Sequence, residues 1–132
     1  MNESNESFSL EDWLKIARKD WKRAKRNLAD EDPEVAGFFL QQSLEKYLKA
    51  YLLKQGWKLK KIHELDALLD EAVKYNPTLK TFYKLCERVT SFYFADRYPP
   101  LGALGITCED IKKDLIEVEK FVRSIFPEEE IS

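Results

Sequence analysis

The sequence predicts an all-α protein, folded as an antiparallel up-and-down bundle of four long helices and one short helix. Apolar residues recur at alternating steps of three and four along most of the chain, which is the spacing of one helix face. No segment alternates apolar and polar residues long enough to form a strand. Prolines and glycines divide the chain into helix-length pieces with brief connections, and short connections place successive helices antiparallel.

Capping residues and helix breakers set the expected limits of the first two helices. Ser9, followed by acidic residues in the next turn, begins the first helix. Asp32 and Pro33 form a cap with proline at the first helical position, so the second helix begins there. Gly56 ends it as a left-handed terminator. The second helix is apolar around most of its circumference, which predicts contacts on several sides and a central place in the fold.

The other three helices are delimited in the same way. A short helix is expected over 64–75, and Asn76-Pro77 breaks the chain before a fourth helix that extends to Asp96. Residues 97–106 form a Pro/Gly-rich loop. The last helix starts at a capping box of Thr107 with Asp110 and ends near 126–127.

Length and composition indicate a single globular domain. The 132 residues divide into a disordered N-terminal tail over 1–8, one domain over 9–127 and a frayed acidic tail over 128–132. The polar N-terminus resembles no secretory signal and no apolar run is long enough to cross a membrane, which predicts a cytoplasmic protein without membrane contact. Cys86 and Cys108 lack metal-binding spacing, and Cys86 is expected to be a buried thiol.

The overall charge gives little indication of a polyanionic partner. The formal net charge is −2, so the field of the whole molecule does not favour nucleic acid. Residues 1–61 carry 13 basic against 10 acidic residues, and residues 62–132 carry 9 against 14. This asymmetry is also what two complementary halves of one fold would show.

A polar strip on the second helix is the first candidate site. Gln42, Glu45, Lys46 and Lys49 stand at i, i+3, i+4 and i+7, so they share one face of an otherwise apolar helix. Glu45 precedes Lys49 by four residues, the favourable order for an ion pair. The strip is either solvated surface, which the residue pattern alone favours, or a polar groove for a phosphate-bearing ligand or a partner.

The second candidate site consists of Arg97 and Tyr98, which stand where the fourth helix ends and the loop begins. A rigidly presented arginine suits bidentate phosphate recognition, and a nearby tyrosine could stack on a base. Tyr93 lies four residues before Arg97 and could share its face. The alternative is an arginine that pairs with a local carboxylate or caps the helix end.

His63, the chain's one histidine, and a basic run on the first helix complete the candidates. His63 lies at the cap of the third helix, where a structural hydrogen bond is the simpler interpretation. A single histidine excludes a His-rich metal site within one subunit, and neither a metal nor a cofactor is expected. The run from Arg18 to Arg26 lies opposite the apolar seam, so it is either a solvated face or a nonspecific, salt-dependent nucleic-acid patch.

Three short segments resemble the HEPN domain family, in order and in register, over about residues 10–126. The run 41–53, QQSLEKYLKAYLL, looks like the second-helix signature of HEPN domains. His63-Glu64-Leu65 is similar to their His-Asp-Leu. Arg97-Tyr98-Pro99 resembles their Arg-Tyr-Pro.

The resemblance implies a helical bundle that often forms a homodimer, with a polar groove near the dimer axis. Many HEPN proteins accompany a minimal nucleotidyltransferase in toxin–antitoxin-like pairs, and others are metal-independent ribonucleases. The ribonuclease branch places a histidine four to six residues after its arginine, and no histidine follows Arg97 here. The chain also lacks the nucleotidyltransferase signature itself, so such an enzyme would be a separate polypeptide.

These observations lead to one main hypothesis and two alternatives. The main hypothesis is a non-catalytic, homodimeric HEPN module that binds a nucleotide or RNA, or docks a separate nucleotidyltransferase. Arg97 and Lys49 would contact phosphate, Tyr98 and Tyr93 would contact a base, and the other strip residues and His63 would orient them. The alternatives are a ribonuclease with a degenerate Arg…His motif and a purely structural dimerisation module.

Overall fold

The protein is all-helical over the residues described by its structure, a computed structural model that covers 8–58, 60–97 and 105–132, with the side chains of 94–97 not included. No strand occurs within these ranges. The elements in chain order are α2 (Leu10–Ala29), α3 (Pro33–Lys54), α4 (Leu65–Tyr75), the 3₁₀-helix η1 (Pro77–Phe82), α5 (Tyr83–Arg97) and α7 (Cys108–Ile125). None of the helices described is both long and apolar enough to cross a membrane.

The helix ends predicted from capping residues are confirmed. Ser9 and Asp12 form a reciprocal capping box at the start of α2, and Thr107 and Asp110 form the same arrangement at the start of α7. The Asp32 side chain accepts a hydrogen bond from a backbone N–H in the first turn of α3, with proline at the first helical position. Gly56 follows α3 at φ 91°, the left-handed conformation expected of a terminator.

The fourth predicted helix begins differently from the expectation. Residues 77–82 form the 3₁₀-helix η1, and the α-helix starts only at Tyr83. The Asn76 side chain accepts from the Thr78 backbone N–H, and the Leu79 N–H donates to the Asn76 carbonyl oxygen three residues earlier. This i→i+3 bonding is the tighter pattern that often opens a helix.

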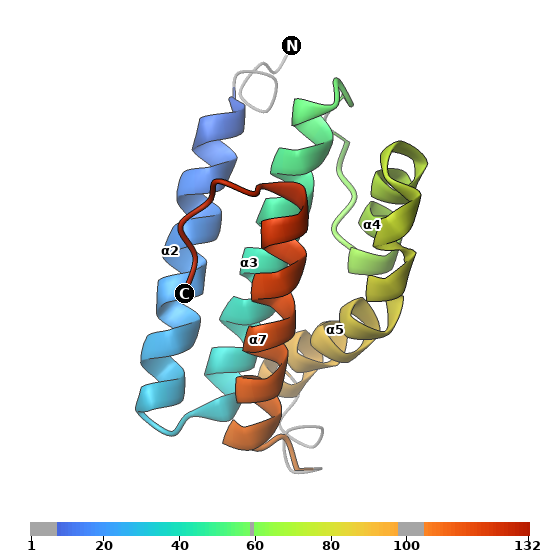
Figure 1. The fold of residues 1–132 in the computed structure, drawn as a ribbon. Coiled ribbons are helices and arrows are strands. Elements are labelled where there is room, and N and C mark those ends of the chain that lie inside the picture. Colours follow the sequence, from blue (N-terminus) through green and yellow to red (C-terminus); the bar gives the residue numbers. More distant parts are fainter. Residues whose placement is uncertain (1–7, 59, 98–104) are drawn as a thin grey trace.

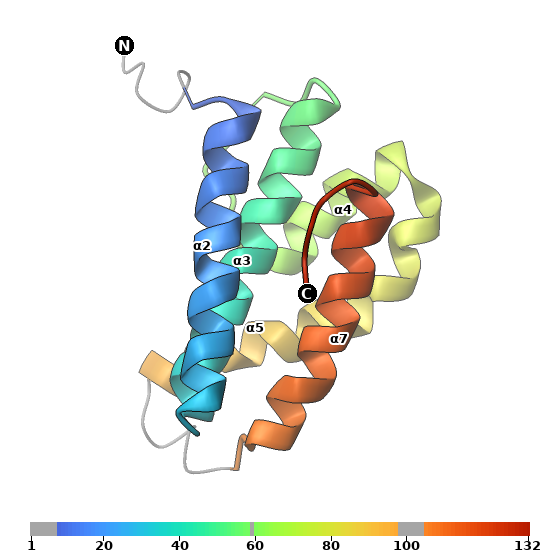
Figure 2. The same ribbon diagram turned by 60° about the vertical axis from the view of Figure 1, so that its left-hand side comes forward.

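Helix α3 is the centre of the fold, as its apolar circumference predicts. It packs against α2, α4, α5 and α7. Its axis lies beside those of α2 and α7 in both views, with α2 running opposite to α3 and α7 running in the same direction as α3 (Figures 1 and 2). Leu40, Leu44, Leu48 and Leu52 are fully buried along it. Cys86 is also buried, and both cysteines are free.

The predicted up-and-down arrangement of four long helices is not confirmed. Helix α5 crosses α3 at a steep angle in both views (Figures 1 and 2). The crossing is close at Gly37, where an added Cβ would lie 2.8 Å from the Cβ of Phe92 and 3.2 Å from the Cδ1 of Ile111. Because Gly37 has no side chain, the two helices can approach at this point.

The prediction that residues 128–132 fray is wrong. This segment folds back over α2 (Figure 1), and Glu129 and Ile131 are buried. The Glu129 carboxylate accepts from Arg18 Nε at 2.7 Å, from Arg18 Nη2 at 3.0 Å and from the Tyr47 hydroxyl at 2.8 Å. Trp21 Nε1 donates to the main-chain oxygen of Ser132. Residues 1–7 of the predicted N-terminal tail lie outside the described residues, and the ring of Phe8 packs edge-on against Trp13.

Candidate functional site

The polar strip on α3 is enclosed by the fold. Glu45 is 4% exposed and Lys49 is 3% exposed, whereas Gln42 and Lys46 are half-buried. The solvated-surface interpretation is therefore wrong for the two residues that form the predicted ion pair. Lys49 Nζ lies 2.9 Å from Glu45 Oε2, so the pair forms at the i, i+4 spacing. A buried charge has to be paired in this way because burial without a partner is costly.

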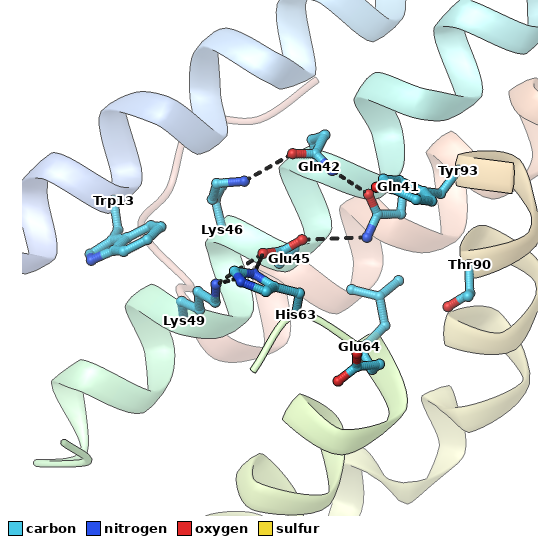
Figure 3. Close-up of a pocket in the computed structure, with 11 residues that line it drawn as sticks. Trp13, Gln41, Gln42, Glu45, Lys46, Lys49, His63, Glu64, Thr90 and Tyr93 are labelled. Carbon is cyan, nitrogen blue, oxygen red and sulfur yellow. Dashed lines mark hydrogen bonds and ion pairs between the residues drawn. The ribbon is translucent and has the colours of Figure 1, made fainter. Parts of the chain in front are cut away.

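The strip forms a continuous chain of hydrogen bonds along one face of α3 (Figure 3). Lys46 Nζ donates to Gln42 Oε1 at 3.1 Å, and Gln42 Nε2 donates to Gln41 Oε1 at 2.6 Å. Gln41 Nε2 then donates to Glu45 Oε1 at 3.5 Å, which connects the amides to the buried carboxylate. The spacing of i and i+4 along the helix brings these groups together.

His63 joins the strip from the connection before α4. Its Nδ1 lies 2.9 Å from Glu45 Oε2 and 3.0 Å from Lys49 Nζ. A protonated Nδ1 donates to the carboxylate, and an unprotonated Nδ1 accepts from the ammonium group, so the tautomer decides which contact is favourable. The imidazole side chain is 65% exposed, so its other edge faces solvent. His63 thus makes a hydrogen bond, as the simpler interpretation expects, but its partners are side chains of the strip and not backbone atoms at the helix cap.

The electrostatics of Glu45 show how strongly its surroundings favour the charged form. Burial by itself would raise the pKa of the Glu45 carboxyl, because a low-dielectric site disfavours charge. The positive charge of Lys46 and the hydrogen bonds from His63 and Lys49 outweigh burial, and the pKa is lower than its ordinary value. Glu45 is therefore a carboxylate that organises the donors around it.

A pocket of about 560 Å³ opens over this strip, and we call it the polar pocket. Six of the eight predicted site residues line it: Gln42, Glu45, Lys46, Lys49, His63 and Tyr93. The structure thus brings together residues from α3, from the connection before α4 and from α5. The other two predicted residues are Arg97 and Tyr98. The described part of the structure includes neither Tyr98 nor the side chain of Arg97.

Five further residues line the polar pocket and were not predicted to do so: Trp13, Gln41, Glu64, Leu65 and Thr90. The position of Gln41, four residues before Glu45, was a signal in the sequence that could have identified it. Trp13 comes from α2, and its ring lies 5.3 Å from Lys49 Nζ. No sequence pattern indicated this contact, because it depends on how α2 packs against α3. Glu64 lies apart from the hydrogen-bonded chain (Figure 3).

The polar pocket offers hydrogen-bond donors more than acceptors. The Lys46 ammonium group has three donors and gives one of them to a neutral amide, Gln42. The Gln42 amide nitrogen has two hydrogens and gives one to Gln41. Glu45 accepts from Gln41 and Lys49, and His63 Nδ1 lies 2.9 Å from its Oε2, so its acceptor capacity is largely used. A ligand rich in acceptor oxygens, such as a phosphate, matches what is left.

The basic run on α2 is a solvated face for the most part. Lys19, Lys22, Lys25 and Arg26 are exposed, as the simpler interpretation predicts. Arg18 departs from this pattern, because it is bound to Glu11 and Glu129. Within the described part of the chain, no group of three or more His, Cys, Asp and Glu side chains is placed to hold a metal ion.

The comparison with known families identifies the class of protein. The HEPN domain model matches residues 10–129, which is nearly the whole chain. The chain therefore belongs to the HEPN domain family, and the resemblance seen in its motifs is confirmed. Membership indicates a module concerned in general with nucleotides or RNA. Neither the curated proteins nor the solved structures contain a match to this chain.

Proposed function

We propose that this HEPN protein is a non-catalytic binding module whose polar pocket takes the phosphate of a nucleotide. The observation that carries the proposal is Lys46, a half-buried cation whose ammonium group donates to a neutral glutamine at the wall of the pocket. An ammonium group bound to an amide can accept a phosphate as a counter-ion without first breaking an ion pair. Phosphate groups bind lysine through strong charge-assisted hydrogen bonds.

The other pocket residues support Lys46 in this proposal. Lys49 lies behind Lys46 in its ion pair with Glu45, and His63 Nδ1 lies within 3.0 Å of both partners of that pair. Tyr93 also lines the pocket and offers an aromatic side chain for a base or a sugar. Arg97 and Tyr98 remain predicted ligand contacts on the basis of the family motif.

Calorimetric titration with ATP at fixed salt tests this function. Lys46→Gln removes the cation but keeps a hydrogen-bonding side chain, and we expect it to weaken ATP binding about tenfold or more. Lys54→Gln is the matched control, because Lys54 is an exposed lysine on the same helix outside the pocket. Equal losses in both variants, or no ATP binding at millimolar concentration, would contradict the proposal.

The geometry at His63 favours ribonuclease activity as a second candidate. When Nδ1 donates to Glu45, the other ring nitrogen, Nε2, can act as a general base, and the imidazole side chain is 65% exposed. RNA is incubated with the protein in EDTA, and His63→Gln and Arg97→Ala are compared with the wild type. Cleavage that is lost in both variants would establish the ribonuclease, and its absence in the wild type would exclude this candidate.

The proposal extends to partners that follow from the family. We propose that the module is a homodimer and that a separately encoded minimal nucleotidyltransferase docks on it, as in toxin–antitoxin-like pairs. Light scattering on the purified protein tests the first part, since one chain has a mass of 15.6 kDa. A measured mass of one chain at micromolar concentration would contradict the homodimer. A protein that binds neither nucleotide nor enzyme but dimerises would be a structural module.

A further inference from the structure

The side chains of Glu45, Lys49 and His63 meet at one point of the polar pocket (Figure 3). Lys49 Nζ lies 2.9 Å from Glu45 Oε2, and His63 Nδ1 lies 2.9 Å from the same oxygen. His63 Nδ1 also lies 3.0 Å from Lys49 Nζ. The three atoms therefore form a triangle in which each side has the length of a hydrogen bond, and we call it the polar triangle.

One side of the polar triangle is unfavourable whether or not Nδ1 of His63 carries a proton. Without a proton, Nδ1 accepts from Lys49, but its lone pair then faces the negative oxygen of Glu45. With a proton, Nδ1 donates to Glu45, but its N–H then faces the ammonium group of Lys49. Lys49 donates to Glu45 in both cases. The polar triangle thus has two arrangements, and a charge that enters the pocket can decide between them.

The described charges that face His63 in the pocket balance one another. Two cations and two carboxylates line the pocket, so their formal charges of +2 and −2 sum to zero while His63 is neutral: Lys46 and Lys49, and Glu45 and Glu64. The described lining from α2 and α5 consists of side chains that carry no charge at neutral pH, namely Trp13, Thr90 and Tyr93. A phosphate that enters this lining makes the pocket negative, and this favours a further positive charge on His63.

The remaining hydrogen-bond capacity of His63 lies at its other ring nitrogen, Nε2. Both contacts of His63 with described residues of the polar triangle are made by Nδ1. The imidazole side chain is 65% exposed although it lines the pocket, whereas the side chains of Glu45 and Lys49 are 5% and 3% exposed. Within the polar triangle, His63 is therefore the residue that a ligand oxygen entering from solvent can reach.

We propose that His63 binds the phosphate in its doubly protonated form, with Nδ1–H donating to Glu45 and Nε2–H donating to a phosphate oxygen, so that the nucleotide binds together with a proton. This inference rests on the proposed function, because it concerns the same phosphate. The proton comes from solvent and stays on the imidazole, and no bond of the nucleotide is broken. The described charged lining then has a formal charge of +1, which attracts an anion.

Neutral His63 suits the site less well. An imidazole with its only proton on Nε2 also donates to a phosphate, but its Nδ1 lone pair then lies 2.9 Å from Glu45 Oε2. Glu45 is a carboxylate, since its pKa is lower than its ordinary value. Protonation of Nδ1 replaces this repulsion with a charge-assisted hydrogen bond and places a positive charge beside the phosphate. Histidine is the side chain whose charge ordinarily changes between pH 5 and 8.

Because His63 is the one histidine of the chain, its titration can be followed directly. The imidazole nitrogen and carbon-bound proton shifts are measured by NMR from about pH 5 to about pH 9, with and without saturating ATP. We expect ATP to raise the titration midpoint of His63 by about one pH unit, which corresponds to about tenfold tighter binding by the protonated form. Both ring nitrogens should carry a proton in the complex below this midpoint.

Calorimetric titration with ATP at about pH 6 and about pH 8 measures the same coupling from the side of the ligand. His63→Gln keeps a neutral hydrogen-bonding side chain, and the ratio of wild-type to variant affinity should be about fivefold greater at the lower pH. The terminal phosphate of ATP also titrates at about pH 6, but wild type and variant share this change, so the ratio removes it. Lys61→Gln is the matched control, because Lys61 is exposed and outside the described lining of the pocket, and its ratio should be equal at both pH values.

The results that would overturn this inference differ from those that would contradict the proposed function. If ATP binds the wild type and binds Lys46→Gln more weakly, while the titration midpoint of His63 stays constant, the phosphate site stands but binds no proton. A midpoint that falls on binding, with Nδ1 unprotonated in the complex, means that neutral His63 binds the phosphate, and it also overturns the inference. Absence of ATP binding at millimolar concentration at both pH values contradicts the proposed function as well.

Discussion

The polar strip of α3 and the α2 basic row, which consists of Lys15, Lys19, Lys22 and Arg26, each follow one helix face but have opposite environments. Glu45 and Lys49 are almost fully buried and paired with each other, whereas Lys19 and Lys22 are exposed. Each pattern, taken alone, is what a solvated helix face looks like. The difference arises from the rest of each helix, because α3 packs against four other helices, whereas α2 packs mainly against α3.

This comparison teaches how to interpret charges on a helix. On a helix with a single apolar seam, charges opposite the seam are solvated and contribute little to stability. On a helix with apolar residues around most of its circumference, a charge has little solvent to face, so it is buried and needs a partner. The same residue types are therefore buried and paired on α3 but solvated on α2.

The largest expected loss of stability comes from removing one charge of the buried Glu45–Lys49 ion pair. Glu45→Gln leaves the Lys49 ammonium group, 3% exposed, without its counter-charge. We expect a loss of about 3–5 kcal/mol in the free energy of unfolding, as for other buried pairs that lose one partner. Urea denaturation followed by circular dichroism measures it.

A double variant separates pairing from packing. Glu45→Leu/Lys49→Met removes both charges and keeps the apolar volume, and we expect it to recover most of the lost stability. If the free energy of unfolding of Glu45→Gln lies within about 0.5 kcal/mol of the wild-type value, Lys49 finds other partners in the variant. The contrast between the two helices would then not hold.

The pH dependence of the same variant sharpens the comparison. The pKa of Glu45 is lower in the folded protein than its ordinary value of 4.5, so ionisation of Glu45 favours the folded state. Its contribution is fully present above about pH 4.5 and is lost as the pH falls through the lowered value. The stability difference between the wild type and Glu45→Gln should therefore be largest at neutral pH and shrink towards pH 3. A difference that stays constant from pH 7 to pH 3 would argue against ionised Glu45 as its source.

Glu129→Gln is expected to have the second largest effect. The carboxylate accepts from Arg18 and Tyr47, and hydrogen bonds to charged groups contribute about 1.5–3 kcal/mol. Because the Arg18 side chain is 39% exposed, solvent weakens its share, and we expect a loss of about 1–2 kcal/mol. Glu128→Gln is the neighbouring control, since Glu128 is exposed. Faster amide exchange at residues 129–131 in Glu129→Gln alone would confirm that this contact holds the segment, and equal exchange in both variants would contradict it.

Gly37→Ala tests how tightly α3 is enclosed, because it adds a methyl group where α5 crosses α3 and leaves the charge unchanged. The added methyl group would meet Phe92 at 2.8 Å, and overpacking of this kind costs about 1–3 kcal/mol. Alanine also favours the helix by about 0.5–1 kcal/mol, so the expected net loss is about 1 kcal/mol. A rise in the melting temperature would show that α5 can move away from α3 without cost.

The elements that sequence predicted well depend on nearby residues. The capping boxes of Ser9 and Thr107 and the terminator Gly56 each act within a turn or so of their own position. The Glu45–Lys49 pair also follows from local spacing. Such features are visible in a single sequence because the interacting groups lie three or four residues apart.

The elements that sequence did not predict depend on distant contacts. Glu129 is buried because it meets Arg18, which lies 111 positions away in the chain. Trp13 reaches the polar pocket from α2, and Gly37 permits the oblique crossing of α5. The burial of Glu45 likewise depends on how neighbouring helices close around α3. These outcomes are set by packing in three dimensions, for which the chain has no local pattern.

The smallest expected effect lies on the α2 basic row. Lys22 is exposed on the outer side of its helix, so Lys22→Gln should change the free energy of unfolding by less than about 0.5 kcal/mol. Its neighbours along the row are cations, whereas Glu128, Glu129 and Glu130 line a hollow with it on the other side, so lost repulsion and lost attraction should nearly cancel at low salt, and both should vanish at high salt. Thermal denaturation at two salt concentrations measures this difference. A clear loss of stability would mean that the row contributes to the fold, and its positive charge would then need no ligand to explain it.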